Sequence, residues 1–177
     1  MFKRIITVLR HRWTDDSDVR RSLPPDMLAR LAERVSASER LHTGEIRFCI
    51  EASLPLTYLW RHLWHGIPVS ELTRQRATMQ FGRMRVWDTE SNNGVLIYLL
   101  LVERKIELLA DRGVNAVVRA EQWQAMVQHM AQTFASGRFE DGLTQALQEV
   151  SAPLVQHFPA RPGSPNPNEL PDHPAVG

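Results

Sequence analysis

The chain has 177 residues, of which 43% are hydrophobic and 23% are charged, and its formal net charge is +1. This length suits one domain with a substantial core, and the composition is typical of a globular protein. The near-zero charge provides no general attraction to DNA or RNA, so we expect no nucleic-acid partner. Cys49 is the only cysteine, which excludes an intrachain disulfide and a cysteine-based zinc site.

The sequence shows neither the pattern of a membrane-spanning helix nor that of a secretory signal. No apolar run approaches the roughly 20 residues that are needed to cross a bilayer. The N-terminus is basic, but it lacks the uninterrupted apolar region and the small-residue cleavage site of a secretory signal. We therefore expect a soluble cytoplasmic protein.

Residues 1–23 predict a basic amphipathic helix followed by a linker. In residues 1–13, apolar and basic residues recur around a helix: Phe2, Ile5, Ile6, Leu9 and Trp13 are apolar, and Lys3, Arg4, Arg10 and Arg12 are basic. Such a helix can lie on an anionic membrane surface as a peripheral contact, or dock on a partner protein. The alternative is a helix that packs on its own domain or frays. Residues 14–23 are charged and are interpreted as the linker.

The next elements alternate between helix and strand. Pro25 opens a helix that ends at Thr43-Gly44, and residues 45–51 alternate apolar and polar side chains as a half-buried strand does. Residues 54–67 predict a short helix or an aromatic-rich loop, and residues 70–86 predict a helix.

A buried hairpin forms the predicted centre of the fold. Residues 95–102 are eight consecutive Val, Leu, Ile and Tyr residues without polar alternation, the pattern of a strand covered on both faces. A short charged turn then leads to residues 106–110, which should return antiparallel beside the first strand. Residues 114–118 predict a short strand or a turn.

The C-terminal third predicts two helices and a tail. Residues 120–136 and 139–158 are amphipathic, and Pro153 should kink or split the second helix. Residues 159–177 contain six prolines and little to bury, and they predict a disordered Pro-rich tail. The domain proper therefore spans residues 24–158.

This order of elements predicts an α/β/α sandwich with a small mixed sheet. The first two strands should be parallel and the third antiparallel to them. The topology then brings His42, Thr43 and Glu45 to the same edge of the sheet as the polar loop 88–93 and Asp111-Arg112.

Oxygen-bearing side chains concentrate at that edge. The candidate metal ligands are Asp88, Glu90, Asn92, Asn93 and Asp111. Carboxylate and amide oxygens are the ligands of hard cations, so the possible cofactor is Ca²⁺ or Mg²⁺. An EF-hand is excluded because Asn93 and Leu99 stand where its glycine and bidentate acid belong. The alternative is that residues 92–94 only form a turn.

Other candidate sites are weaker. His62 and His65 could share a helix face, but no third zinc ligand accompanies them. Cys49 lies within a strand and is interpreted as a small buried side chain rather than a nucleophile. Trp87 and Arg112 flank the acidic edge and are candidates for contact with a partner or an anion.

Residues 86–98 (VWDTESNNGVLIY) and 104–114 (RKIELLADRGV) resemble the signature of the TPM-domain family. Residues 44–48 and 134–142 resemble the family's first strand and the turn between its last helices. The resemblance covers roughly residues 25–158. At residues 111–114 the chain departs from the Gly-Tyr-Gly-Leu-Glu-like run of many members, which removes one acidic position.

The resemblance implies an α/β/α sandwich and, as in some members, a divalent cation, chiefly calcium, bound by loops at one edge of the sheet. It also implies a possible weak acid phosphatase activity, as for a plant thylakoid member associated with photosystem II repair. Many bacterial members carry a signal peptide and a C-terminal membrane anchor; this sequence looks like a short cytoplasmic type without either.

Three functions follow as hypotheses. The first is a cation-binding interaction module that acts through a protein partner. The second is a weak metal-assisted phosphatase, in which Arg112 would steady the developing charge. The third is a membrane-surface adaptor that uses residues 1–13.

Overall fold

The computed structural model describes residues 1–14, 16–161, 163 and 166–177. Its helices are α1 (Phe2–Trp13), α2 (Asp16–Ser22), α3 (Pro25–Glu39), α4 (Leu56–His65), α5 (Val69–Arg83), α6 (Arg112–Val117), α7 (Ala120–Ala135) and α8 (Phe139–His157), with a short 3-10 helix, η1 (Leu101–Glu103). Its strands are β1 (Ile46–Glu51), β2 (Val95–Leu100), β3 (Lys105–Ala110) and β4 (Ala175–Val176).

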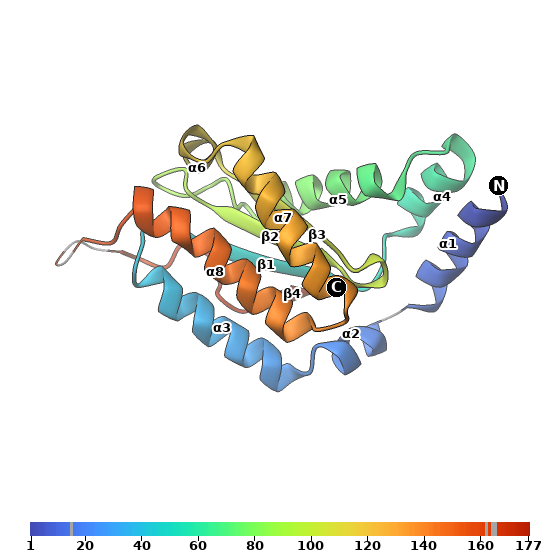
Figure 1. Ribbon diagram of the computed structural model, residues 1–177, viewed down its shortest axis with the longest axis horizontal. Coiled ribbons are helices and arrows are strands. Elements are labelled where there is room, and N and C mark those ends of the chain that lie inside the picture. Colours follow the sequence, from blue (N-terminus) through green and yellow to red (C-terminus); the bar gives the residue numbers. More distant parts are fainter. Residues whose placement is uncertain (15, 162, 164–165) are drawn as a thin grey trace.

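The strands form one mixed sheet in the order β3-β2-β1-β4 (Figure 1). β1 and β2 are parallel, with Ile46 opposite Val95, and β2 and β3 are antiparallel, with Val95 opposite Ala110. All six residues of β2 are buried, as expected of an inner strand that is covered on both faces. The predicted hairpin and its parallel neighbour are confirmed.

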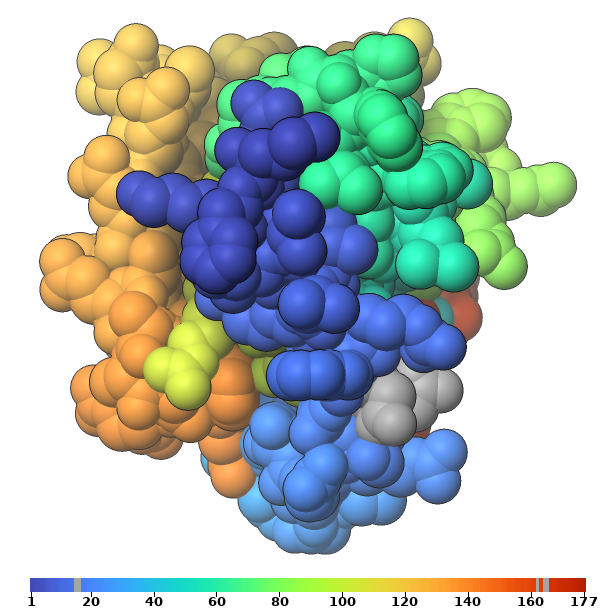
Figure 2. Space-filling view, turned by 90° about the vertical axis from the view of Figure 1, so that its right-hand side faces the viewer, coloured from blue at the N-terminus to red at the C-terminus, as the bar shows by residue number. Residues whose placement is uncertain are grey.

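The two N-terminal helices lie at different places on the domain. α1 packs beside α4 at the end of the molecule to which β1 leads, and Figure 2 looks onto this end, with α1 in dark blue. The predicted linker at 14–23 is wrong for most of its length, because residues 16–22 form α2. Val19 and Leu23, one turn apart, are both buried in the core, which explains why this charged segment folds.

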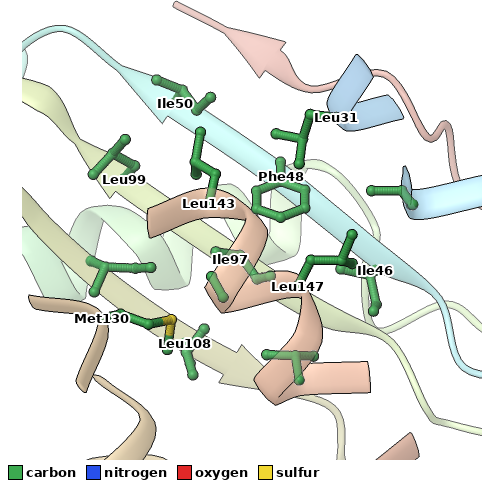
Figure 3. Close-up of a cluster of buried hydrophobic side chains, with 14 of the residues drawn as sticks. Leu31, Ile46, Phe48, Ile50, Ile97, Leu99, Leu108, Met130, Leu143 and Leu147 are labelled. Carbon is green, nitrogen blue, oxygen red and sulfur yellow. The ribbon is translucent and has the colours of Figure 1, made fainter. Parts of the chain in front are cut away.

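Helices cover both faces of the sheet, which confirms the α/β/α sandwich. Side chains of α3, α7 and α8 pack on one face, where Leu31, Met130 and Leu147 meet Phe48 and Ile97 (Figure 3). A second cluster on the other face joins β2 to α4 and α5 through Tyr98, Leu59 and Leu72, among others. The sheet is therefore held from both sides by apolar burial.

Two other expectations about helices are corrected. Residues 112–117 form the helix α6 rather than a strand or turn, because the Asp111 carboxylate accepts the Arg112 N–H at 2.7 Å and caps it. Of the two effects predicted for Pro153, a split is wrong, because α8 continues through Pro153 to His157 as one helix. None of the helices described is both long and apolar enough to span a membrane.

The C-terminal segment differs most from its prediction. Residues 166–177 do not form a disordered tail but run along β1, where the Gly177 N–H donates to the Ile50 carbonyl at 3.0 Å. Leu170 is buried in the second cluster, and its N–H donates to the Glu45 carboxylate at 3.0 Å. The segment is ordered because it covers an otherwise unpaired strand edge and buries one large apolar side chain. Residues 162 and 164–165 of the predicted tail lie outside the described residues.

Candidate functional site

Three segments meet where β1 and β2 begin and β3 ends. The Asp111 N–H donates to the Gly94 carbonyl at 2.8 Å, and the Gly113 N–H donates to the Asn92 carbonyl at 2.9 Å. The Asn93 side-chain amide donates to the Thr43 carbonyl at 2.9 Å. The structure thus brings the polar loop, the turn before β1 and the end of β3 to one edge of the sheet, as the topology predicts.

The loop before β2 is an ordered turn. The Asn93 N–H donates to the buried Thr89 hydroxyl at 3.0 Å, and Asn92 adopts φ of +52°, a conformation that Asn tolerates well. Gly94 is required for a different reason, since a Cβ atom there would lie 1.9 Å from the Val86 carbonyl oxygen. The turn interpretation therefore accounts for Asn92 and Gly94.

Two side-chain oxygens at this edge have no explanation within the turn. Among the described residues, no hydrogen-bond donor reaches the buried Asn93 Oδ1 or the buried Asp111 Oδ2. Asn93 is fully buried and Asp111 is 9% exposed. An unsatisfied buried polar atom costs about 1–3 kcal/mol, so such atoms commonly mark the place of a water or an ion.

The remaining predicted ligands are placed differently. Asp88 and Glu90 are exposed, and the Asn92 Oδ1 atom accepts from Arg112 Nε at 2.8 Å. Arg112 itself is exposed, and Trp87 is 51% exposed. Of the five predicted ligands, only Asn93 and Asp111 are buried with a free oxygen.

The C-terminal segment adds a residue that sequence reasoning missed. The Glu169 carboxylate accepts the Glu90 N–H at 3.0 Å and therefore reaches the polar loop. Nothing in the local pattern signals this contact, because it depends on residues 166–177 crossing the start of β1.

Two buried carboxyl groups, those of Glu39 and Glu45, lie beside this edge, and their surroundings favour the protonated form. Burial raises the pKa of Glu39 to about 8, and it also raises the pKa of Glu45. Glu39 Oε1 accepts the Ile46 N–H at 2.8 Å. Burial lowers the pKa of His42, whose Nδ1 lies 2.9 Å from the Gly44 carbonyl oxygen. These groups connect α3, β1 and the C-terminal segment and are explained by that structural role.

The donor set fits a cation only in part. In the described part of the chain, no group of three or more His, Cys, Asp or Glu side chains is arranged to hold a metal ion. A cation at this edge would therefore depend on one carboxylate, one amide, backbone carbonyls and water. Ca²⁺ and Mg²⁺ accept such mixed oxygen ligands.

The other candidate residues have structural roles. His62 Nδ1 lies 2.7 Å from the Ile67 carbonyl oxygen, and His65 is exposed. Cys49 is 2% exposed, and burial raises the pKa of its thiol to about 12, so it is no nucleophile at neutral pH.

A cavity of about 820 Å³ lies along the outer side of β3, between α5 and α7, and reaches Ala110 and Asn115 next to Asp111. Arg74 Nη1 donates to the Leu108 carbonyl at 2.6 Å and Asn115 Nδ2 donates to the Ala110 carbonyl at 2.6 Å, so side chains cover part of the outer edge of β3. This cavity is better explained as a protected strand edge than as a site.

The fold and its loop-lined edge define a small α/β/α sandwich domain. The family model described as the TPM domain matches residues 17–152, and the chain belongs to the TPM-domain family. Among solved structures, the chain is similar to the BA42 protein of the psychrophilic bacterium Bizionia argentinensis, determined by NMR. The two share a TM-score of 0.72 and 23% identity over 88% of this chain and 95% of that chain, which shows a common fold. Comparison with the curated proteins gave no match.

Proposed function

We propose that this TPM domain binds a divalent cation at the edge formed by the polar loop and the end of β3, and that it acts through a protein partner. The observation that carries the proposal is the pair of buried oxygens, Asn93 Oδ1 and Asp111 Oδ2, for which the described residues supply no donor. Both atoms are acceptor oxygens without a donor, and such oxygens are suitable ligands for a hard cation.

Asn93 and Asp111 would be the protein ligands, with water completing the shell. Asp88 and Glu90 are exposed and would add negative potential around the ion. Asn92 is a weaker candidate than its position suggests, because its Oδ1 already accepts from Arg112. Arg112 and Trp87 are exposed beside this edge and would provide the contact with a partner or its anionic group.

The experiment is calorimetric titration of Ca²⁺ and Mg²⁺ into chelator-treated protein. Asp111→Asn is the test variant, because Asn caps a helix as well as Asp does and should leave α6 intact. Asp88→Asn is the control, since it removes the same charge from an exposed position of the same edge. We expect saturable binding that Asp111→Asn weakens at least about tenfold, while Asp88→Asn changes it less than about threefold.

Two outcomes would contradict the proposal. One is the absence of binding heat for either ion with a protein that is folded by circular dichroism. The other is equal weakening by both substitutions, which would indicate diffuse attraction to an acidic surface rather than a site at Asp111.

Phosphatase activity is the alternative and has less support. Arg112 lies close enough to bond Asn92 and could steady a phosphoryl group near a cation. Cys49 is buried with a raised thiol pKa, so it supplies no nucleophile. An assay with p-nitrophenyl phosphate and Ca²⁺ or Mg²⁺ separates the two functions, because only an enzyme would show turnover that Asp111→Asn removes. The third hypothesis, membrane contact through residues 1–13, concerns the opposite end of the molecule.

A further inference from the structure

The apolar stripe of α1 faces away from the domain. Its five members lie at helical spacing, and each is substantially exposed: Phe2 (76%), Ile5 (42%), Ile6 (50%), Leu9 (45%) and Trp13 (79%). A surface helix ordinarily turns such a stripe towards the core. In α1 the stripe is exposed instead, so it is available to contact another surface.

The opposite face of α1 fixes this orientation. His11 is buried; its Nδ1 accepts the Leu54 N–H at 3.1 Å, and its Nε2 lies 3.0 Å from a Glu103 carboxylate oxygen. Val8, one turn earlier on the same face, packs against the second core cluster. α1 is therefore docked through the side that carries Val8 and His11, and its exposed stripe is not a consequence of fraying.

α4 extends the apolar surface. Leu56, Trp60 and Trp64 follow one another at intervals of four residues and are 67%, 61% and 65% exposed. The two tryptophan rings contact each other edge to face, with centroids 5.5 Å apart. α1 and α4 lie side by side on the end of the molecule that Figure 2 faces.

This surface, named here the α1–α4 patch, concentrates the exposed apolar residues. In the described part of the chain, fifteen large apolar residues are substantially exposed, and eight of them belong to these two helices. Clustered exposure of this kind marks a site of contact with a membrane or a protein.

The charges around the patch favour an anionic surface over a second copy of the chain. α1 and α4 contain no Asp or Glu and carry five basic residues, Lys3, Arg4, Arg10, Arg12 and Arg61. At 3.6 residues per turn, Lys3 and Arg10 fall on one side of the α1 stripe and Arg12 on the other. Arg10 pairs with Glu103, whereas Lys3 and Arg12 are exposed. Two copies joined through this patch would bring like charges together, which opposes a symmetric dimer.

We propose that the α1–α4 patch docks on an anionic lipid surface. The exposed stripes would enter the boundary between headgroups and acyl chains, where Trp is favoured, and the flanking Lys and Arg would meet lipid phosphates. Both helices would lie in the plane of the membrane rather than cross it. The cation-binding edge would then point away from the lipid, since it lies at the other end of β1 and β2.

The test is co-sedimentation of the full chain with vesicles of phosphatidylcholine alone and of phosphatidylcholine with 30% phosphatidylglycerol. The double substitution Trp60→Ser with Trp64→Ser removes the α4 anchors. Leu41→Ser is the control, because Leu41 is 60% exposed and precedes β1 at the other end of the sheet. We expect binding to the anionic vesicles that the double substitution weakens at least about tenfold and the control leaves unchanged.

A second pair of variants tests the charge. Lys3→Gln with Arg12→Gln should weaken binding to anionic vesicles, and added salt should do the same. Arg40→Gln with Arg119→Gln, which changes the same charge away from the patch, should have no effect. All these residues are exposed, so circular dichroism should show an unchanged fold.

Three results would overturn the proposal. The first is that the wild-type chain binds neither kind of vesicle. The second is that the double tryptophan variant binds as well as the wild type. The third is a dimer in analytical ultracentrifugation that the double variant dissociates, since a second copy would then cover the patch.

Discussion

Asn93 joins the loop before β2 to the turn before β1, because its Nδ2 atom donates to the Thr43 carbonyl at 2.9 Å. This bond fixes the amide so that Oδ1 remains buried without a donor among the described residues. The backbone of the next residue is held equally firmly, since the Gly94 carbonyl accepts the Asp111 N–H at 2.8 Å. A cation site at this edge would therefore be built on rigid strand ends rather than on a mobile loop.

Gly94→Ala should destabilise the fold by about 3 kcal/mol or more, because its Cβ atom would lie 1.9 Å from the Val86 carbonyl oxygen. Gly82 is the matched control near the end of α5, where a Cβ atom meets nothing within 4 Å. Gly82→Ala should be neutral or stabilising by up to about 1 kcal/mol. Urea unfolding measures both, and equal midpoints for the two variants would show that the loop can move away from Val86.

Arg76→Ala should cost about 3–5 kcal/mol, because it strands the buried Glu51 carboxylate, which accepts from Arg76 Nε at 2.8 Å. Gln80 and Tyr98 also donate to Glu51, at 2.7 and 2.6 Å, but neither carries a positive charge. The control is Arg74→Ala on the same helix, where the Arg74 side chain is 53% exposed and the expected loss is about 1 kcal/mol. Similar losses of thermal stability in both variants would contradict this difference in burial.

The sheet could be predicted because its signals are local. Residues 95–102 show no polar alternation, which is the pattern of an inner strand in a sheet covered on both faces. α2 and the C-terminal segment could not be predicted with the same rules, since the burial of Val19 and Leu170 depends on distant partners. The spacing of Val19 and Leu23, one helical turn apart, is the one signal of α2 that the sequence contains.

The candidate site shows the same division. Residue type identifies which side chains can offer oxygen to a cation, and topology brings them to one edge. Burial and pairing then separate them: Asn93 and Asp111 are enclosed with free oxygens, Asn92 is engaged by Arg112, and Asp88 is exposed. Such differences arise from hydrogen bonds between segments that are far apart in the chain, so composition cannot reveal them.

Leu170→Ala should loosen the C-terminal segment and expose Cys49. Both residues belong to the second core cluster, and β4 pairs Ala175 with Cys49. A loss of about 2 kcal/mol for this Leu→Ala change would raise the labelling rate of the thiol by about thirtyfold. Labelling with a thiol reagent at pH 8 measures this, and Val155→Ala, at a 39% exposed position of α8, is the control. Equal rates would show that Leu170 does not hold the segment.

Glu39→Gln should stabilise the protein at alkaline pH and have little effect at pH 5. Burial, with the neighbouring charges of Glu45 and Asp172, raises the pKa of Glu39 from 4.5 to about 8. The folded state therefore retains a proton that the unfolded chain releases, so the stability associated with Glu39 is full below pH 4.5 and is lost as the pH rises to about 8. Gln keeps an oxygen that can accept the Ile46 N–H and carries no charge.

At pH 9 we expect Tm to rise by about 4 °C or more in Glu39→Gln relative to the wild type, with a difference below about 2 °C at pH 5. Glu33→Gln is the control, because Glu33 lies exposed on the same helix and should show no such pH dependence. Scanning calorimetry at the two pH values measures the effect. A gain in Tm of the same size at pH 5 and pH 9 would contradict the prediction. It would mean either that the substitution acts through packing or that Glu39 is ionised in the folded protein at both pH values.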